Sequence, residues 1–275
     1  MTQRQHDPQL DRLLAHVEEL CDRAARGAFS HTAFLTPREA KHARALLCRL
    51  GQWHRARTWG GYDGAERVMI LLFPDYVCDL IDKDGWHTHP VSELLMLAGE
   101  EDPVVALSMR GSGYRTLTHR DFLGSLLSLG LEREVLGDIA IDGQGKDATV
   151  FCTARMASFL LTSVERIGGD VVRVQQTSVP SDFDGGRRYL AVRDTIASPR
   201  LDCIVAALCN LSRETAQTAV RNGLVEVDYD CEDRPDHVVD IPCIVSVRGY
   251  GKFALRSLGS PNRRGRLPLI ADKYV

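Results

Sequence analysis

The chain has 275 residues, of which 44% are hydrophobic and 26% charged, an ordinary composition for a soluble globular protein. This length fits about two domains, or three small ones. A net charge of -3 excludes a globally basic nucleic-acid binder. No apolar run approaches the roughly 18 residues of a membrane-spanning helix, and the first twelve residues lack a signal-peptide core. We therefore expect a cytoplasmic protein with no membrane partner.

The eight cysteines are scattered along the chain and form no Cys-x-x-Cys pair. In a chain of this size that pattern is typical of reduced cysteines packed as small hydrophobic residues. No disulfide framework is expected.

Charge is distributed unevenly along the chain. Residues 187–275 contain 14 basic and 11 acidic residues, a net charge of +3, whereas the remainder has a net charge of -6. Residues 245–266 contain six basic residues and no acidic one, and residues 226–240 contain seven acidic residues and only Arg234. Because the local field steers a polyanion, this basic segment favours nucleic-acid binding despite the net charge.

The first sixty residues predict a helical N-terminal module, residues 1–60. Apolar side chains recur at helical spacing between residues 7 and 27, where Gly27 ends the pattern. Thr36, Pro37 and Glu39 have the spacing of a capping box with proline at the first helical position. A second helix is therefore expected to run from there to about Leu50.

A glycine-rich segment, residues 60–64, precedes an apolar run over residues 68–73. Paired glycines can cradle phosphate, but no Gly-Lys-Ser/Thr follows, which excludes a P-loop. The segment is interpreted as a turn that leads into a strand.

Residues 61–186 predict a second, α/β domain. Strands are expected at 104–109, 137–141, 148–153 and 171–174, with helices at 119–129 and 156–167. This βαββαβ order is that of the split βαβ plait, which RNA-recognition modules share. Such modules stack bases on strand aromatics, and here the central strands offer only Phe151. The plait is therefore either a scaffold or a domain that binds through another surface.

Residues 187–275 predict two short helices followed by a β-ribbon. On the second helix Arg213, Gln217 and Arg221 lie at i, i+4 and i+8, and therefore along one face. Two guanidiniums and an amide side by side suit phosphate oxygens and base edges. Ser212 is placed to cap the start of this helix and Gly223 to end it.

This C-terminal segment resembles the S4 RNA-binding domain. The resemblance rests on four groups of residues: Ser198 with Arg200, Leu201 and Asp202; Leu211 to Arg213; Gly223, Val225 and Val227; and Arg248 to Lys252. Two positions depart from the S4 pattern, with Asp228 in place of Asn and Pro242-Cys243 in place of Gly-Asp. Since an acidic side chain repels phosphate, Asp228 predicts a weaker contact at its position.

A longer set of motifs resembles the YlmH family of bacterial S4-domain proteins. It comprises Gly60 to Tyr62, Glu66-Arg67, Phe73 to Tyr76, His119 to Gly124, Leu129-Gly130, Arg133 and Gly137 to Ile139. The resemblance implies an α+β protein with a helical N-terminal part, an RRM-like middle domain and a C-terminal S4 domain. It also implies a role in ribosome quality control, on large ribosomal subunits that carry peptidyl-tRNA, and a genetic link to cell division.

Catalytic and metal-binding interpretations are weaker. His119, Arg120 and Asp121 stand at a helix start without a kinase-type glycine loop, and His87 and His89 lack further ligands at metal spacing. Arg200-Leu201-Asp202 resembles the triplet around the catalytic aspartate of pseudouridine synthases, but those enzymes place S4 before a larger catalytic domain. An arginine–aspartate pair that orders the fold is the preferred interpretation of Asp202.

The sequence therefore predicts a non-catalytic RNA-binding protein without cofactor or metal. The expected partners are rRNA and tRNA on the large ribosomal subunit, together with protein factors of ribosome rescue or division. An S4-containing RNA-modifying enzyme and a cell-division scaffold are the alternatives. The predicted RNA-binding residues are Arg200, Ser212, Arg213, Gln217, Arg221, Arg248 and Lys252. The predicted secondary contacts are Arg120, Arg133, Arg263, Arg264 and Arg266.

Overall fold

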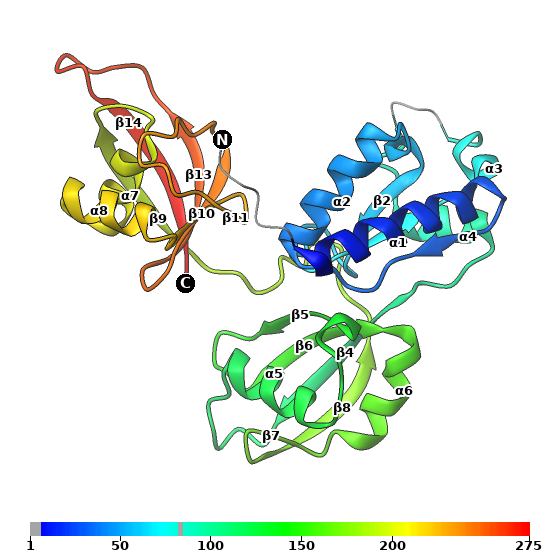
Figure 1. The fold of residues 1–275 in the computed structure, drawn as a ribbon. Coiled ribbons are helices and arrows are strands. Elements are labelled where there is room, and N and C mark those ends of the chain that lie inside the picture. The colour runs from blue at the N-terminus through cyan, green and yellow to red at the C-terminus, as the bar shows by residue number, and fades with distance from the viewer. Residues whose placement is uncertain (1–6, 82–84) are drawn as a thin grey trace. The chain divides into compact units, whose positions relative to one another are not determined.

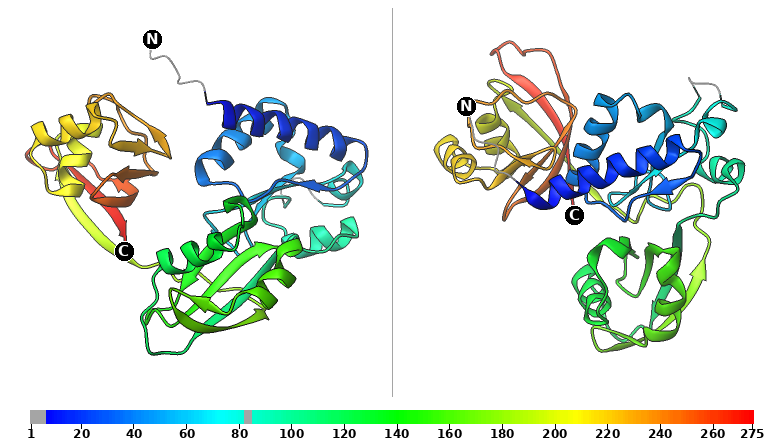
Figure 2. Two further views of the ribbon diagram at one scale, coloured as in Figure 1. Left: turned by 60° about the horizontal axis from the view of Figure 1, so that its bottom comes forward. Right: turned by 45° about the vertical axis from the view of Figure 1, so that its right-hand side comes forward.

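The computed structural model of the protein describes residues 7–81 and 85–275 (Figures 1 and 2). The chain is a mixed α/β protein with three antiparallel sheets. It divides into two compact units, an N-terminal unit that extends to residue 186 and a C-terminal unit of residues 187–275. Each unit has its own hydrophobic core. None of the helices in the described residues is both long enough and apolar enough to cross a membrane.

Two amphipathic helices open the N-terminal unit, α1 (Pro8–Ala25) and α2 (Pro37–Arg49). The Asp7 carboxylate caps α1, and Thr36 and Glu39 form the predicted capping box at the start of α2. Val17 and Leu20 of α1 share a core with Leu46 and Leu47 of α2. Both predicted helices are therefore confirmed, including the end of α2 near residue 50.

A three-stranded sheet continues the N-terminal unit, with strand order β1-β3-β2. Its bounds are β1 (Ser30–His31), β2 (Ala56–Trp59) and β3 (Met69–Leu72). Strands β2 and β3 pair on either side of the predicted domain boundary after residue 60, which therefore falls inside a hairpin. The turn predicted at residues 60–64 is tightly packed, because a Cβ on Gly60 would lie 2.4 Å from that of Ala65. The remaining short elements are η1 (Trp53–Arg55), α3 (Asp75–Cys78) and α4 (Val91–Ala98).

The middle of the chain forms a five-stranded antiparallel sheet with strand order β5-β6-β4-β8-β7. One face packs on two helices, through Phe122 and Leu126 of α5 and Leu160 of α6. The helix predicted over 156–167 ends at Ser163, because residues 166–167 form a strand that pairs with β8. The bounds are β4 (Val104–Gly111), α5 (His119–Ser128), η2 (Arg133–Val135), β5 (Leu136–Ile141), β6 (Asp147–Thr153), α6 (Ala154–Ser163), β7 (Arg166–Ile167) and β8 (Asp170–Thr177).

The other face of this sheet is covered by residues from outside the sheet. Phe151 of β6 is fully buried, with ring centroids 4.9 Å from Tyr62 and 5.9 Å from Phe183. Gly61 lies so close that a Cβ there would stand 2.4 Å from the Phe151 ring. The one aromatic residue that sequence placed on the central strands is therefore unavailable for base stacking.

Asp138 of β5 ties the sheet to the segment that follows Gly61. Its carboxylate accepts hydrogen bonds from the Tyr62 hydroxyl at 2.6 Å and from the backbone N–H groups of Glu66 and Arg67 at 2.8 and 3.0 Å. The buried Arg67 guanidinium donates to the Leu136 carbonyl at 2.9 Å. These hydrogen bonds therefore join β5 to the segment between β2 and β3 within the N-terminal unit.

The C-terminal unit is a six-stranded antiparallel sheet with strand order β11-β10-β12-β13-β14-β9 and two helices against one face (Figure 1). The predicted helix pair is present, but the sheet is larger than a ribbon, because β9 precedes the helices and pairs with the last strand. The bounds are β9 (Tyr189–Ile196), α7 (Leu201–Cys209), α8 (Arg213–Arg221), β10 (Val225–Val227), β11 (Asp230–Cys231), β12 (Cys243–Val247), β13 (Gly251–Leu258) and β14 (Leu267–Tyr274).

Candidate nucleic-acid interface

Helix α8 begins and ends where its sequence predicts. The Ser212 side chain accepts a hydrogen bond from the backbone N–H of Thr215 at 3.1 Å, and Gly223 follows the helix with a φ of 67°. The apolar side of α8, at Ala216 and Val220, is fully buried in the core that α7 shares. The polar side of α8 therefore has a fixed orientation.

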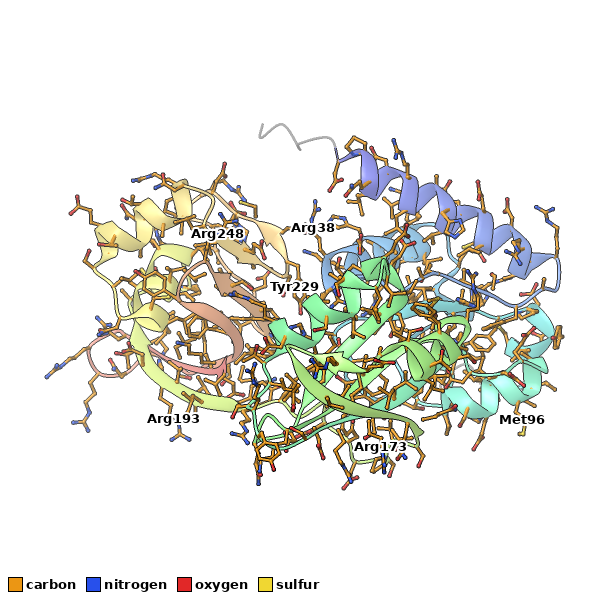
Figure 3. The ribbon with its side chains drawn as sticks, turned by 90° about the horizontal axis from the view of Figure 1, so that it is seen from below. Arg38, Met96, Arg173, Arg193, Tyr229 and Arg248 are labelled. Atoms are coloured by element: carbon orange, nitrogen blue, oxygen red, sulfur yellow. The ribbon has the colours of Figure 1, made fainter. Side chains whose placement is uncertain are left out.

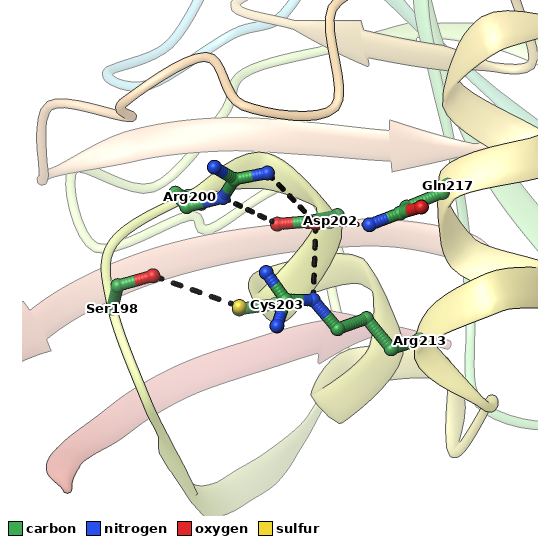
Figure 4. A network of polar contacts seen from close by, with 6 residues as sticks. All are labelled: Ser198, Arg200, Asp202, Cys203, Arg213 and Gln217. Atoms are coloured by element: carbon green, nitrogen blue, oxygen red, sulfur yellow. Dashed lines mark hydrogen bonds and ion pairs between the residues drawn. The ribbon is translucent and has the colours of Figure 1, made fainter.

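Asp202 of α7 stands at the centre of a polar network that this side of α8 completes (Figure 4). Its side chain is fully buried. Arg200 donates to both carboxylate oxygens at 3.1 Å, Arg213 donates to one of them at 3.2 Å, and Gln217 donates to the same oxygen at 2.8 Å. Four donor contacts satisfy a carboxylate that would otherwise be costly to bury.

This network keeps Asp202 ionised. Burial opposes ionisation, but the hydrogen bonds from Arg200, Gln217 and Arg213 outweigh it and hold the pKa of the carboxyl well below its usual range. The three donors are therefore anchored by a full negative charge. The preferred interpretation of Asp202, a residue that orders the fold, fits this geometry.

The three α8 side chains predicted to share one face therefore differ in their surroundings. Arg213 and Gln217 both turn toward Asp202, whereas Arg221 is exposed at the end of the helix. The Arg213 side chain still exposes 58% of its surface, so its guanidinium is held in place and remains accessible on one side. Arg200 is less exposed, at 35%.

Arg248 lies in the turn between β12 and β13, and this turn is joined to the segment after α8. The backbone N–H of Arg248 donates to the Leu224 carbonyl at 2.9 Å. Arg221 is three residues before Leu224, and the side chains of Arg221 and Arg248 are both exposed. Within the described part of the chain neither guanidinium pairs with a carboxylate. Figure 3 labels Arg248 on this unit.

Lys252 lies on the outer face of the sheet, opposite the helices, among aromatic rings that no local sequence motif indicates. Its ammonium nitrogen is 4.7 Å from the ring centroid of Tyr274 and 5.1 Å from that of Tyr229. Tyr274 packs edge-on against Tyr189 at 5.0 Å. Only the pairing of β9 with β14 brings Tyr189 and Tyr274 together, and that pairing joins the two ends of the unit. Local sequence patterns carry no signal for it.

The secondary contacts predicted from sequence differ in their surroundings. Arg120, Arg263 and Arg264 are exposed. The Arg266 side chain donates to the Thr195 hydroxyl at 3.0 Å. Arg133 is directed into the N-terminal unit, where it donates to the Leu136 carbonyl at 3.0 Å.

Burial and the nearby charge of Arg67 lower the pKa of Arg133 to about 10. Arg133 is partly buried and bonded to the main chain, so its guanidinium supports the local fold, and its role as an RNA contact stays a prediction.

Asp228, the acidic departure from the S4 pattern, is bound to the main chain. It and Tyr229 adopt φ values of 46° and 68° in the turn between β10 and β11. The Asp228 carboxylate accepts a hydrogen bond from the backbone N–H of Ile244 at 2.8 Å. Aspartate tolerates this left-handed conformation nearly as asparagine does, so the substitution preserves the turn.

The two histidines considered as metal ligands face different partners. The His87 ring stacks on Trp53 with centroids 5.4 Å apart, and His89 lies 3.0 Å from the Glu93 carboxylate. No group of three His, Cys, Asp or Glu side chains in residues 7–81 and 85–275 is arranged to hold a metal ion.

Two family models match separate parts of the chain. The family model described as "YlmH, N-terminal" matches residues 11–77, and the one described as "Putative RNA-binding domain in YlmH" matches residues 109–181. Together they match about half of the chain. The chain belongs to the YlmH family.

Members of this family and their relatives extend the comparison. The chain is 29% identical over 238 residues to "Ribosome-associated protein quality control protein P2" of Bacillus subtilis (strain 168), which covers 86% of this chain and 83% of that protein. It is similar to the solved structure "Cell division protein ylmH from Streptococcus pneumoniae", with 20% identity and a TM-score of 0.48. That match covers 67% of this chain and all of the other.

Proposed function

We propose that this YlmH-family chain is a non-catalytic RNA-binding protein that acts on the ribosome in ribosome quality control. In this proposal the C-terminal unit is an S4-type domain and its ligands are rRNA and tRNA. The particle is the large ribosomal subunit carrying peptidyl-tRNA.

The observation that carries the proposal is the arrangement of cations on the C-terminal unit. Asp202 anchors Arg200 and Arg213 in fixed positions, and Arg221 and Arg248 stand exposed around the junction of α8 and β10. Guanidiniums held by a second hydrogen-bond partner lose less entropy when they bind phosphate. Phosphate contacts of this kind fix the orientation of structured RNA, while shape supplies the selectivity.

The family comparisons support the proposed RNA-binding function through another part of the chain. The family model described as "Putative RNA-binding domain in YlmH" matches residues 109–181, and the Bacillus relative is named for ribosome-associated quality control. Since the sheet face that carries Phe151 is covered, RNA contact by this segment would use a different surface, such as the α5 end at the exposed Arg120. The middle domain would then be an RRM-like plait without the usual stacking platform.

The surroundings of Asp202 favour binding over catalysis. A catalytic aspartate needs access to its substrate, whereas this side chain is fully buried and is bonded to three neighbouring side chains. The pseudouridine-synthase alternative therefore gains no support from the one residue that suggested it.

Crosslinking of the protein to RNA in cells, with sequencing of the fragments and a parallel sucrose gradient, tests the proposal. We expect fragments of large-subunit rRNA and tRNA, and migration of the protein with free large subunits. The variant Arg221→Gln with Arg248→Gln should lose both signals. Arg234→Gln, with the same charge change per site but within the acidic segment, should keep them. Wild-type protein at the top of the gradient without enriched RNA would instead favour a scaffold role, for example in division.

A further inference from the structure

A solvent-accessible pocket of about 470 Å³ opens in the N-terminal unit. It lies between α2, η1, β2 and the glycine-rich turn that precedes β3, a turn to which the RNA-binding proposal gives no role. The residues with charged or aromatic side chains that line it are Arg44, Trp53, Arg57, Trp59, Tyr62, Asp63 and His87. This volume is that of a small-molecule site and far exceeds the space that a single phosphate ion needs.

Arg44 is held at the pocket by an aromatic ring. Its guanidinium carbon lies 4.8 Å from the ring centroid of Trp53. Among the described residues Arg44 forms no ion pair with a carboxylate. Because stacking leaves the edge of the guanidinium available, its N–H groups can still donate to an anion in the pocket.

Arg57 supplies a second guanidinium, which is half-buried. One of its terminal nitrogens donates to the carbonyl oxygens of Trp86 and His89, the latter at 2.8 Å. Burial lowers the pKa of Arg57, and the negative charge of Asp63 partly offsets this. Neutral carbonyls orient the group without neutralising it, so a bound anion would compensate the cost of its desolvation.

The charge balance of the pocket is positive. Among the described residues that line it, Asp63 is the only acidic one, against two arginines. The pKa of His87 is lowered by burial and then by the charges of Arg57 and Arg44. Two cations that both lower the pKa of the same ring indicate a local field that attracts anions.

We propose that this pocket binds a nucleotide through its phosphate group. Arg44 and Arg57 would hold the phosphate oxygens, and the indole rings of Trp53 and Trp59 would line the space for the base. The two sources of such a group are a free nucleoside phosphate and the terminal nucleotide of an RNA strand. The inference goes beyond the proposed function, because it concerns the N-terminal unit and needs no contribution from Arg221 or Arg248.

Tryptophan fluorescence offers a direct test in the full-length chain. The chain has three tryptophans, and all of them lie in the pocket lining or next to it, at positions 53, 59 and 86. We expect adenosine 5′-monophosphate to change the emission saturably below roughly 1 mM, and adenosine to bind at least about tenfold more weakly. Arg44→Gln should weaken binding of the monophosphate by about tenfold, the loss expected for one charge-assisted hydrogen bond.

Matched variants separate this site from other effects. Arg49→Gln removes an exposed arginine from the same helix outside the pocket and should leave the titration unchanged. The double variant Arg221→Gln/Arg248→Gln should also leave it unchanged, so failure of the RNA-binding proposal and failure of this one are distinguishable. Because Arg44 is exposed, its substitution should not prevent folding.

The two sources are distinguished by competition with a short single-stranded RNA, with and without a 5′-phosphate. Tighter binding of the phosphorylated strand than of the monophosphate identifies an RNA end, and the reverse order identifies a free nucleotide; both support the phosphate site. Equal affinity for adenosine and its monophosphate, or an unchanged titration in Arg44→Gln, would overturn the proposal. Absence of a saturable response up to roughly 1 mM would overturn it as well.

Discussion

The middle sheet and the C-terminal sheet are built alike and differ in the use of their second face. Each is antiparallel and packs one face on two helices. In the middle sheet the second face buries Phe151 under Tyr62 and Phe183. In the C-terminal sheet the second face carries Tyr189, which is 42% exposed, beside Tyr274 and Lys252.

The two sheets therefore share an architecture but differ in whether their second face is available to bind a ligand. The second face of the middle sheet forms part of a core, whereas the sheet of the C-terminal unit presents aromatic rings beside cations. Rings beside cations on a sheet surface suit base stacking and phosphate contact. The comparison predicts that substitutions on the covered face change stability, and that substitutions on the outer face of the C-terminal sheet change RNA affinity.

The largest expected effect is that of Phe151→Ala. Removal of a fully buried aromatic ring costs about 3–5 kcal/mol of unfolding free energy. Urea unfolding followed by tryptophan fluorescence measures it, because all three tryptophans lie in the N-terminal unit. Phe159→Ala, on the same unit but 39% exposed, is the control and should cost far less. Equally small losses of unfolding free energy for the two variants would mean that the Phe151 face of the middle sheet is open to solvent.

Gly61→Ala tests how closely the covering segment approaches the middle sheet. Gly61 has a φ of 94°, and a Cβ there would overlap the Phe151 ring, so we expect a loss of about 2–4 kcal/mol. Gly27→Ala has a similar φ of 90° but meets nothing within 4 Å, so strain alone should cost about 1–2 kcal/mol. The same unfolding assay compares them, and a Gly61 loss no larger than that of Gly27 would argue against the close contact.

The Asp202 network should make the C-terminal unit sensitive to acid. The folded-state pKa of Asp202 lies below its unfolded value, so its stabilisation is complete above the unfolded value of about 3.9 and is lost as the pH falls from there. Asp202→Asn should lower stability at pH 7 by about 1–3 kcal/mol, because buried donors lose a charged acceptor.

Hydrogen exchange of residues 201–221 measures this loss, with the exposed Asp240→Asn as the control. We expect the difference between wild type and Asp202→Asn to shrink below about pH 4. A difference that is independent of pH would contradict an ionised Asp202.

Tyr274→Ala addresses the outer face of the C-terminal sheet and has the smallest expected effect. The side chain is half-buried, so stability should change by less than about 1 kcal/mol. If the ring stacks with a base, RNA affinity should fall about fivefold. A filter-binding assay with large subunits measures it, and Tyr114→Ala, at a site that is 94% exposed in the N-terminal unit, should bind as wild type does. Unchanged affinity for Tyr274→Ala would limit the interface to the helix side.

Local patterns in the sequence predicted the elements well. The capping box at Thr36 and the cap at Ser212 are set by residues three positions apart, and both helices begin where those residues predict. The alternating order of strands and helices between residues 104 and 177 is also present. Such features depend on neighbours in sequence, and sequence is therefore sufficient to find them.

Features that depend on distant residues were not predictable. No local signal joins Tyr189 to Tyr274 or places Gly61 on Phe151, since each contact requires the strand pairing and the packing of a whole unit. For the same reason the spacing predicts a face shared by Arg213 and Gln217 but gives no sign that both donate to a carboxylate on the preceding helix. Spacing on a helix gives a shared face but not the identity of what that face contacts.

The most direct test of the RNA-binding account is the salt dependence of binding to large ribosomal subunits by wild-type protein and the Arg221→Gln/Arg248→Gln variant. Each exposed guanidinium that meets a phosphate should contribute about one unit to the slope of log affinity against log salt. If both guanidiniums meet phosphates, the variant binds more weakly and its slope is reduced by about two units, whereas Arg234→Gln is unchanged. An unchanged affinity and slope in the double variant would contradict it.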